Sequence, residues 1–88
     1  MKSKAPTLPP FALVVLSHGF VYSGVPRIEG EYIHITGAKN VRVSGTARGF
    51  GQLAVDGPTK GTQLDPCPDV LAPLSALVHL ITCTCKPF

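Results

Sequence analysis

The sequence predicts a small, mainly β domain: an antiparallel meander or sandwich-like arrangement of about four to six short strands, with one short C-terminal helix and extended proline-rich arms. Three observations lead to this prediction. The chain has 88 residues, which is enough for one domain. All nine prolines lie outside residues 27–57, and all nine glycines lie between Gly19 and Gly61. Because proline removes a backbone donor, a proline-free stretch with regular glycines is typical of strands joined by tight turns. Apolar residues also alternate within that stretch, as they do in half-buried strands.

The N-terminal part of the chain predicts an arm and then buried strands. Residues 1–10 hold three prolines and show no hydrophobic period, so we expect an extended N-terminal arm. Residues 11–16 are continuously apolar, which favours a fully buried strand at the start of a β-rich domain over residues 11–60. A turn at residues 17–19 would let residues 20–22 pair back.

The same apolar run bears on targeting. It is shorter than the roughly 7–15 apolar residues of a secretory signal. No stretch reaches the roughly 18 apolar residues that a membrane span needs. We therefore expect an intracellular or virion-associated protein rather than a secreted one, with no transmembrane span.

An internal near-repeat predicts the strands of the proline-free stretch. Residues 33–40, 41–48 and 53–60 share one pattern: apolar, any, apolar, small polar, Gly, then a loop with a Lys or Arg. We expect three strands joined by glycine turns, with these apolar residues on one face: Ile33, Ile35, Val41, Val43, Leu53 and Val55. His34 and Arg42 would then lie together on the other face. The alternative is one coil of a parallel β-helix, which would need a partner or further copies on which to stack.

The C-terminal third predicts a linker and a helix. Residues 61–69 contain a proline-rich approach that excludes a helix, so we expect a linker there. Residues 70–88 are expected to form a short helix and a tail that pack on the sheet or on a partner. The helix is predicted from apolar residues at helical spacing: Leu74, Leu77, Val78 and Ile81. Such a helix lacks a polar face and would have to be buried.

Charge and cysteine content narrow the function classes. The net charge is +3, and the eight Lys and Arg are spread along the chain, a bias too weak to demand a nucleic-acid partner. Three cysteines, Cys67, Cys83 and Cys85, make an odd number, so we expect reduced thiols; one bridge from Cys67 to either of the others is the alternative. The Cys-x-Cys step with His79 nearby differs from the usual chelating spacing, and we predict no metal or other cofactor. No spacing brings a nucleophile to a base, so we expect no enzyme.

One short motif points to nucleic acid. Arg48-Gly49-Phe50-Gly51 matches the first four positions of the strand signature K/R-G-F/Y-G/A-F-V-x-F/Y. The segment therefore resembles the RNA-recognition motif, although Gln52 stands where that family has a ring that stacks on a base. The resemblance implies a strand that takes part in nucleic-acid binding.

The function expected from these features is structural. We expect a non-enzymatic accessory subunit that docks on a larger protein assembly, such as a virion or another multi-protein complex, or that associates with itself. A small core, a charged fraction of only 15% and arms that order on a partner favour this class. The alternatives are a small secreted protein with one disulfide, acting as a toxin or inhibitor, and a weak nucleic-acid-binding module. The candidate interaction residues are His34, Arg42, Arg48 and Phe50.

Overall fold

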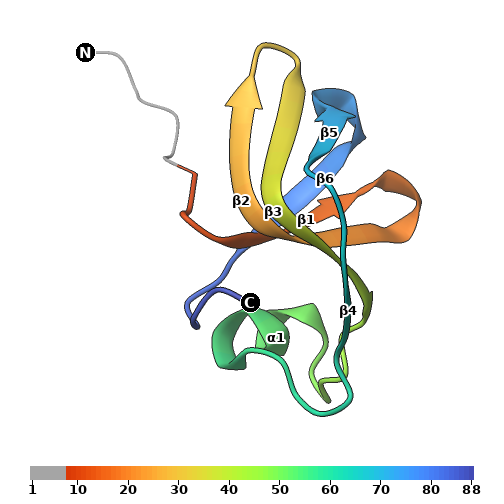
Figure 1. Ribbon diagram of the computed structural model, residues 1–88, viewed down its shortest axis with the longest axis vertical. Coiled ribbons are helices and arrows are strands. Elements are labelled where there is room, and N and C mark those ends of the chain that lie inside the picture. Colours follow the sequence, from red (N-terminus) through yellow and green to blue (C-terminus); the bar gives the residue numbers. More distant parts are fainter. Residues whose placement is uncertain (1–7) are drawn as a thin grey trace.

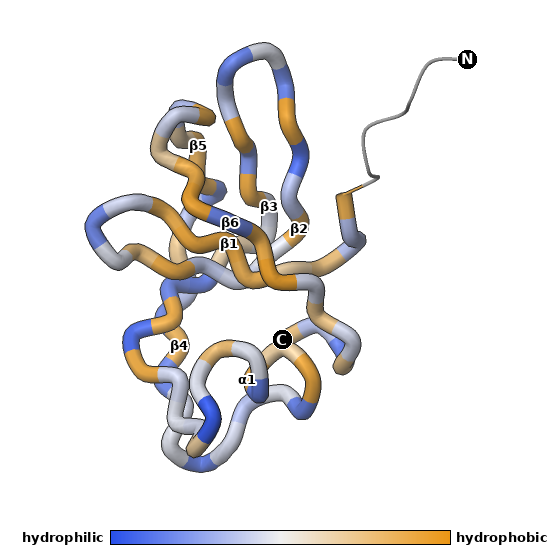
Figure 2. The backbone as a smooth tube through the Cα atoms, turned by 180° about the vertical axis from the view of Figure 1, so that it is seen from behind, coloured by the Kyte–Doolittle hydropathy of each residue, from blue (hydrophilic) through white to orange (hydrophobic). Residues whose placement is uncertain are grey.

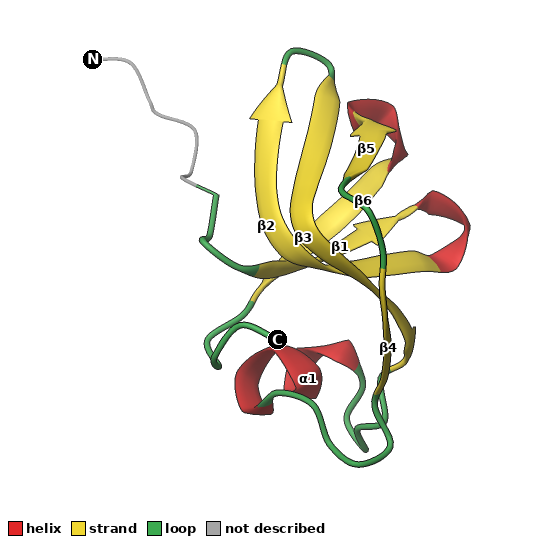
Figure 3. Ribbon diagram, in the orientation of Figure 1, coloured by secondary structure: helices red, strands yellow, loops and turns green. Residues whose placement is uncertain are grey.

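A computed structural model of the chain describes residues 8–88, so the expected arm over residues 1–10 lies largely outside the described residues. The elements in chain order are β1 (Ala12–Leu16), η1 (Ser17–Gly19), β2 (Phe20–Glu29), β3 (Tyr32–Val43), α1 (Phe50–Asp56), β4 (Gln63–Pro66), β5 (Val70–Pro73), η2 (Leu74–Ala76) and β6 (Leu77–Thr82). The six strands form one antiparallel sheet in the order β4-β3-β2-β1-β6, and β5 also pairs with β3 (Figure 1). The expected mainly β fold with one short helix is confirmed (Figure 3).

The sheet curls until its two edges lie close together. β5 pairs with β3 at one edge and β6 pairs with β1 at the other, yet only η2 separates β5 from β6 in the chain. A 3-10 turn rises about 2 Å per residue, so these two strands must be neighbours in space. The result is a half-open barrel, with the β2–β3 hairpin projecting at one end and α1 at the other (Figure 1).

Strand β1 is buried on both faces, as its continuous apolar run predicts. Leu13 packs on the outer face of the sheet and Val14 inside the curl, and both are 0% exposed. The apolar character of β1 and of β6 beside it is visible in Figure 2. The outer cluster consists of Phe11, Leu13, Val21, Val41, Leu53, Ala54 and Cys83. The inner cluster consists of Val14, Leu16, Ile33, Ile35, Ala38 and Ala72.

The near-repeat does not form three strands. Residues 33–43, which hold the first copy and the start of the second, belong to the single strand β3, and residues 53–56 of the third copy belong to α1. The expected three strands with a glycine turn after each copy are therefore wrong, although β1 to β4 do follow one another across the sheet as an antiparallel meander. All strand pairs among residues 8–88 are antiparallel, so the parallel β-helix alternative is wrong as well.

A β-bulge explains why the repeat does not share one face. Gly37 and Ala38 of β3 together lie opposite Gly24 of β2, and Gly37 has φ +61, which glycine adopts easily. The extra residue shifts the alternation of side chains along β3. Ile33 therefore lies in the inner cluster and Val41 in the outer one, although their positions differ by an even number and strict alternation would put them on one face.

The helix lies in the third copy of the repeat rather than near the C-terminus. Phe50, Leu53 and Ala54 stand at positions i, i+3 and i+4, and all three pack in or against the outer cluster. This spacing suits one face of a helix. Gly57, with φ +84, ends α1, and its N–H donates to the Leu53 carbonyl at 2.9 Å.

Residues 70–81, expected to be a helix, form β5, η2 and β6, and the expected linker over residues 61–69 contains β4. The helical spacing arises from irregularities between and within strands. η2 interrupts the alternation, and Val78 is an extra residue opposite β1 that shifts it again. As a result, residues three apart all pack against the inner cluster: Leu74, Leu77 and Leu80.

Candidate functional site

The outer cluster covers only the part of the outer face nearest α1. Cross-strand partners share a face of a sheet. Arg27 lies opposite His34, His34 lies opposite Leu71, and Glu29 lies opposite Tyr32. This part of the β2–β3 hairpin and β5 is not covered by any element of residues 8–88. We call it the open face, and it consists of Val25, Arg27, Glu29, Tyr32, His34, Thr36, Leu71 and Pro73.

Three polar side chains form a small network on the open face. Arg27 Nε lies 3.0 Å from Glu29 Oε2, and His34 Nε2 lies 3.1 Å from Glu29 Oε1. The Arg27 and Glu29 side chains are each 55% exposed, so solvent screens their interaction and it contributes at most about 1 kcal/mol. Its main consequence is charge balance, because one guanidinium and one carboxylate cancel on this surface.

Large apolar side chains lie around this network. Val25 is 45% exposed, Tyr32 50% and Leu71 57%. Each belongs to a different strand of the open face: β2, β3 and β5. In Figure 2 hydrophobic and hydrophilic segments alternate along the β2–β3 hairpin, as expected for a sheet with one face turned to solvent. Exposed tyrosine and arginine beside apolar side chains are typical of protein–protein interfaces.

The structure does not bring the four candidate interaction residues together. His34 lies on the open face. Arg42 lies on the opposite face of β3, because of the bulge, and its Nε is 2.6 Å from Asp65 Oδ2. Arg48 precedes α1, and Phe50 in α1 is half-buried against the outer cluster. The expectation that His34 and Arg42 share a face is therefore wrong.

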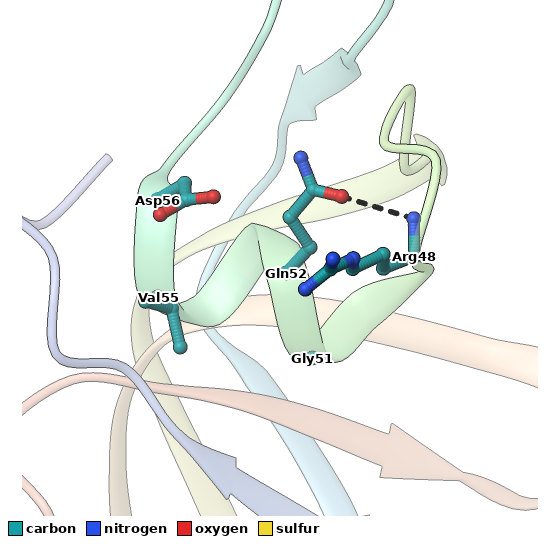
Figure 4. Close-up of a pocket in the computed structure, with 5 residues that line it drawn as sticks. All are labelled: Arg48, Gly51, Gln52, Val55 and Asp56. Carbon is teal, nitrogen blue, oxygen red and sulfur yellow. Dashed lines mark hydrogen bonds between the residues drawn. The ribbon is translucent and has the colours of Figure 1, made fainter.

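A shallow hollow of about 470 Å³ lies beside α1 (Figure 4). It is lined by Arg48, Gly51, Gln52, Val55 and Asp56. The Arg48 backbone N–H donates to Gln52 Oε1 at 2.9 Å, which fixes the start of α1. The lining supplies a guanidinium, an amide and a carboxylate.

Because residues 50–56 are helical, the segment that resembles the RNA-recognition signature does not form the strand on which that family stacks bases.

The three thiols are unpaired and lie in two clusters. Cys67 packs against the inner cluster, whereas Cys83 belongs to the outer cluster and Cys85 packs against it. A bridge from Cys67 to either of the other two would have to cross the sheet. Among residues 8–88, no three or more His, Cys, Asp or Glu side chains gather as a metal site would require.

Stability is expected to fall at alkaline pH because of Cys83. Burial, with a smaller contribution from Cys85, raises the pKa of the Cys83 thiol from 9.0 to about 11. Between these two values the folded chain holds a proton that the unfolded chain has lost. The contribution of this thiol is therefore complete below pH 9 and is lost as the pH rises to 11, a loss of up to about 3 kcal/mol.

Urea unfolding of the wild type and of Cys83→Ala, at pH values below and above that window, measures this effect. The wild type is expected to lose more free energy of unfolding than the variant over the same interval. Equal losses in the two proteins would show that the Cys83 thiol is not buried.

These features place the chain in a broad class: small, mainly antiparallel β proteins with a curled sheet. No family model, no curated protein and no solved structure matches the chain. Among the helices of residues 8–88, none has the length and apolar character to cross a membrane.

Sequence analysis missed most of the open face. Gly30 has φ +58 in a two-residue loop between β2 and β3, a conformation for which hairpins use glycine. That loop fixes Glu29 opposite Tyr32 and therefore Arg27 opposite His34. A glycine hairpin loop at this point of the sequence could therefore have predicted that these four residues share a face. Leu71 had no such signal, because β5 reaches β3 only through a long-range pairing.

Proposed function

We propose that the chain is a non-enzymatic structural subunit that docks through its open face on a larger protein assembly, such as a virion or another multi-protein complex. The observation that supports the proposal is a sheet surface with three half-exposed apolar side chains around a balanced ion pair. A partner that covers it removes apolar area from water, worth roughly 25 cal/mol per Å². Arg27 and Glu29 enter that contact already paired, which lowers the cost of burying each charge.

The strand edges favour docking through the face rather than by strand addition. The register of β2 with β1 ends at Gly24, so residues 25–29 have no strand partner on that side among residues 8–88. Pro26 lies in this free edge and lacks an N–H that an added strand could use. β4 and β5 likewise end in Pro66 and Pro73. Prolines at sheet edges are a common protection against strand addition.

Sedimentation of the tagged full-length chain from its own cells tests the proposal. We expect the wild type to sediment in a particle much larger than a single chain. Leu71→Asp puts a charge on the open face and should release the chain, because the apolar contact would then bury an unpaired carboxylate. Val78→Asp is the matched control, since both side chains are 57% exposed and Val78 lies at the β6 bulge.

The control variant should sediment with the wild type. Identical sedimentation of Leu71→Asp and the wild type would contradict the proposal. Both substitutions replace exposed side chains, so a folded chain is expected in each case, and circular dichroism of the purified variants checks this.

A further inference from the structure

We infer that the open face binds a second copy of this chain, and that a two-fold dimer is the unit from which the assembly is built. The inference rests on the proposed function, because it names the partner of the same face. Three features of the open face favour a copy of itself over a partner of different chemistry: its charge pattern, its charge balance and the placement of its apolar side chains.

The charge pattern of β2 is self-complementary. Arg27 and Glu29 are two residues apart on one strand, so both side chains leave the sheet on the open face. When the two-fold axis crosses β2 at a right angle between residues 27 and 29, the two β2 strands run in opposite directions across each other. Arg27 of one copy then faces Glu29 of the second copy, and the reverse pair forms by symmetry. Each guanidinium keeps its own carboxylate, 3.0 Å away, and gains another.

Charge balance removes the usual obstacle to self-association. A surface with charges of one sign repels its own copy when the two are placed face to face. On the open face, one guanidinium and one carboxylate cancel, and His34 contacts the same Glu29 carboxylate at 3.1 Å. A different protein that recognised this chain by net charge would be expected to bind a surface whose charges all have one sign, which the open face is not.

The apolar side chains lie where a two-fold contact buries them on both sides. Tyr32 lies opposite Glu29 on β3, and Leu71 lies opposite His34 on β5. They are 50% and 57% exposed, so each copy brings apolar area to the contact. Sheets that pack face to face bury such side chains between them. Because the open face is small, the dimer is expected to dissociate on dilution.

Sedimentation velocity of the purified full-length chain over a concentration series tests this inference. We expect the wild type to shift from monomer to dimer as the concentration rises. Arg27→Glu makes the β2 pattern all acidic and Glu29→Arg makes it all basic. Either variant alone is expected to dimerise at least about tenfold more weakly, because like charges then meet across the axis.

The decisive experiment mixes the two variants, Arg27→Glu and Glu29→Arg. In an equal mixture, each acidic β2 meets a basic one, so a heterodimer should form with affinity near that of the wild type. The double variant Arg27→Glu/Glu29→Arg should also recover the homodimer, because its pattern is reversed and still self-complementary. A charge reversal on the opposite face, Arg42→Glu, serves as the control and should leave dimerisation unchanged.

Two results would overturn the inference: a wild type that remains monomeric at all concentrations, or variants that dimerise as strongly as the wild type and show no gain on mixing. Its failure can be told apart from failure of the proposed function. The purified chain could be monomeric while Leu71→Asp is still released from the large particle in cells. In that case the partner is another protein, and docking through the open face stands. If Leu71→Asp changes neither measurement, both proposals fail.

Discussion

Replacing Gly45 with alanine is expected to unfold the chain or to lower its free energy of unfolding by about 4 kcal/mol or more. A Cβ atom at this position would overlap the Gly61 carbonyl carbon and the Thr62 nitrogen. Both are backbone atoms, so no side-chain rotation relieves the overlap. Gly45 also has φ +66, which costs other residues about 1–2 kcal/mol. Total stability near 5–10 kcal/mol is typical for a domain of this length.

The overlap would separate the two loops on either side of α1. Thr59 Oγ1 donates to the Gly45 carbonyl at 2.6 Å, and Thr62 Oγ1 donates to the Ser44 carbonyl at 2.6 Å. These bonds tie the segment before α1 to the segment after it. Moving the backbones apart breaks both bonds and separates the loop that enters α1 from the loop that leaves it.

Thermal melting followed by circular dichroism measures the effect, with Gly51→Ala as the control. Gly51 lies in α1, and a Cβ there would meet nothing within 4 Å. Alanine at an exposed helical position should raise stability by about 0.5–1 kcal/mol. Two variants with the same melting temperature would show that the loops do not cross at Gly45 and Gly61.

Leu53→Ala is expected to cost about 2–5 kcal/mol, whereas Val55→Ala should change stability by less than about 0.5 kcal/mol. Leu53 is 0% exposed in the outer cluster, and Val55 is 59% exposed on the far side of α1. In a strand, these two side chains would lie on the same face and would be buried to a similar extent. In a helix, side chains two positions apart point to nearly opposite sides.

Urea unfolding of the two variants distinguishes the helix from the strand. A large loss for Leu53→Ala with almost none for Val55→Ala agrees with α1. Similar losses for both variants would agree with the strand that the repeat pattern indicates, and would contradict the helix.

Local patterns predicted the parts of the fold that depend on local chemistry. Six continuous apolar residues, 11–16, predicted a buried strand, and β1 is buried on both faces. The proline-free stretch predicted extended structure, and β3 runs through twelve of its residues. The mainly β class followed from these two signals.

Side-chain facing could not be predicted from alternation alone. The bulge at Gly37 reverses the face of the β3 residues that follow it, up to a second irregularity between Val41 and Val43. A glycine in a strand pattern is equally compatible with a turn. The same holds for Val78 in β6, which makes two strands look like a helix. Such one-residue shifts depend on the register with neighbouring strands. That register is set by long-range pairs, which a single sequence does not show.

The candidate site shows the same limit. His34 was selected from the repeat and does lie on the open face. The same alternation predicted that Arg42 shares a face with His34, but Arg42 lies on the opposite face of the sheet. A docking surface formed by β2, β3 and β5 joins segments about forty residues apart, from residues 25–36 to residues 71–73. The composition of the chain and the spacing of its residues do not predict that β5 pairs with β3.

The most direct test of the open face as a docking surface is photo-cross-linking in the protein's own cells. A photo-activatable phenylalanine analogue replaces Leu71 in one variant and Val78 in another; the two positions are equally exposed at 57%. We expect illumination to attach the first variant to another protein chain and to leave the second variant free. Equal adducts from both positions, or none from position 71, would contradict docking through the open face.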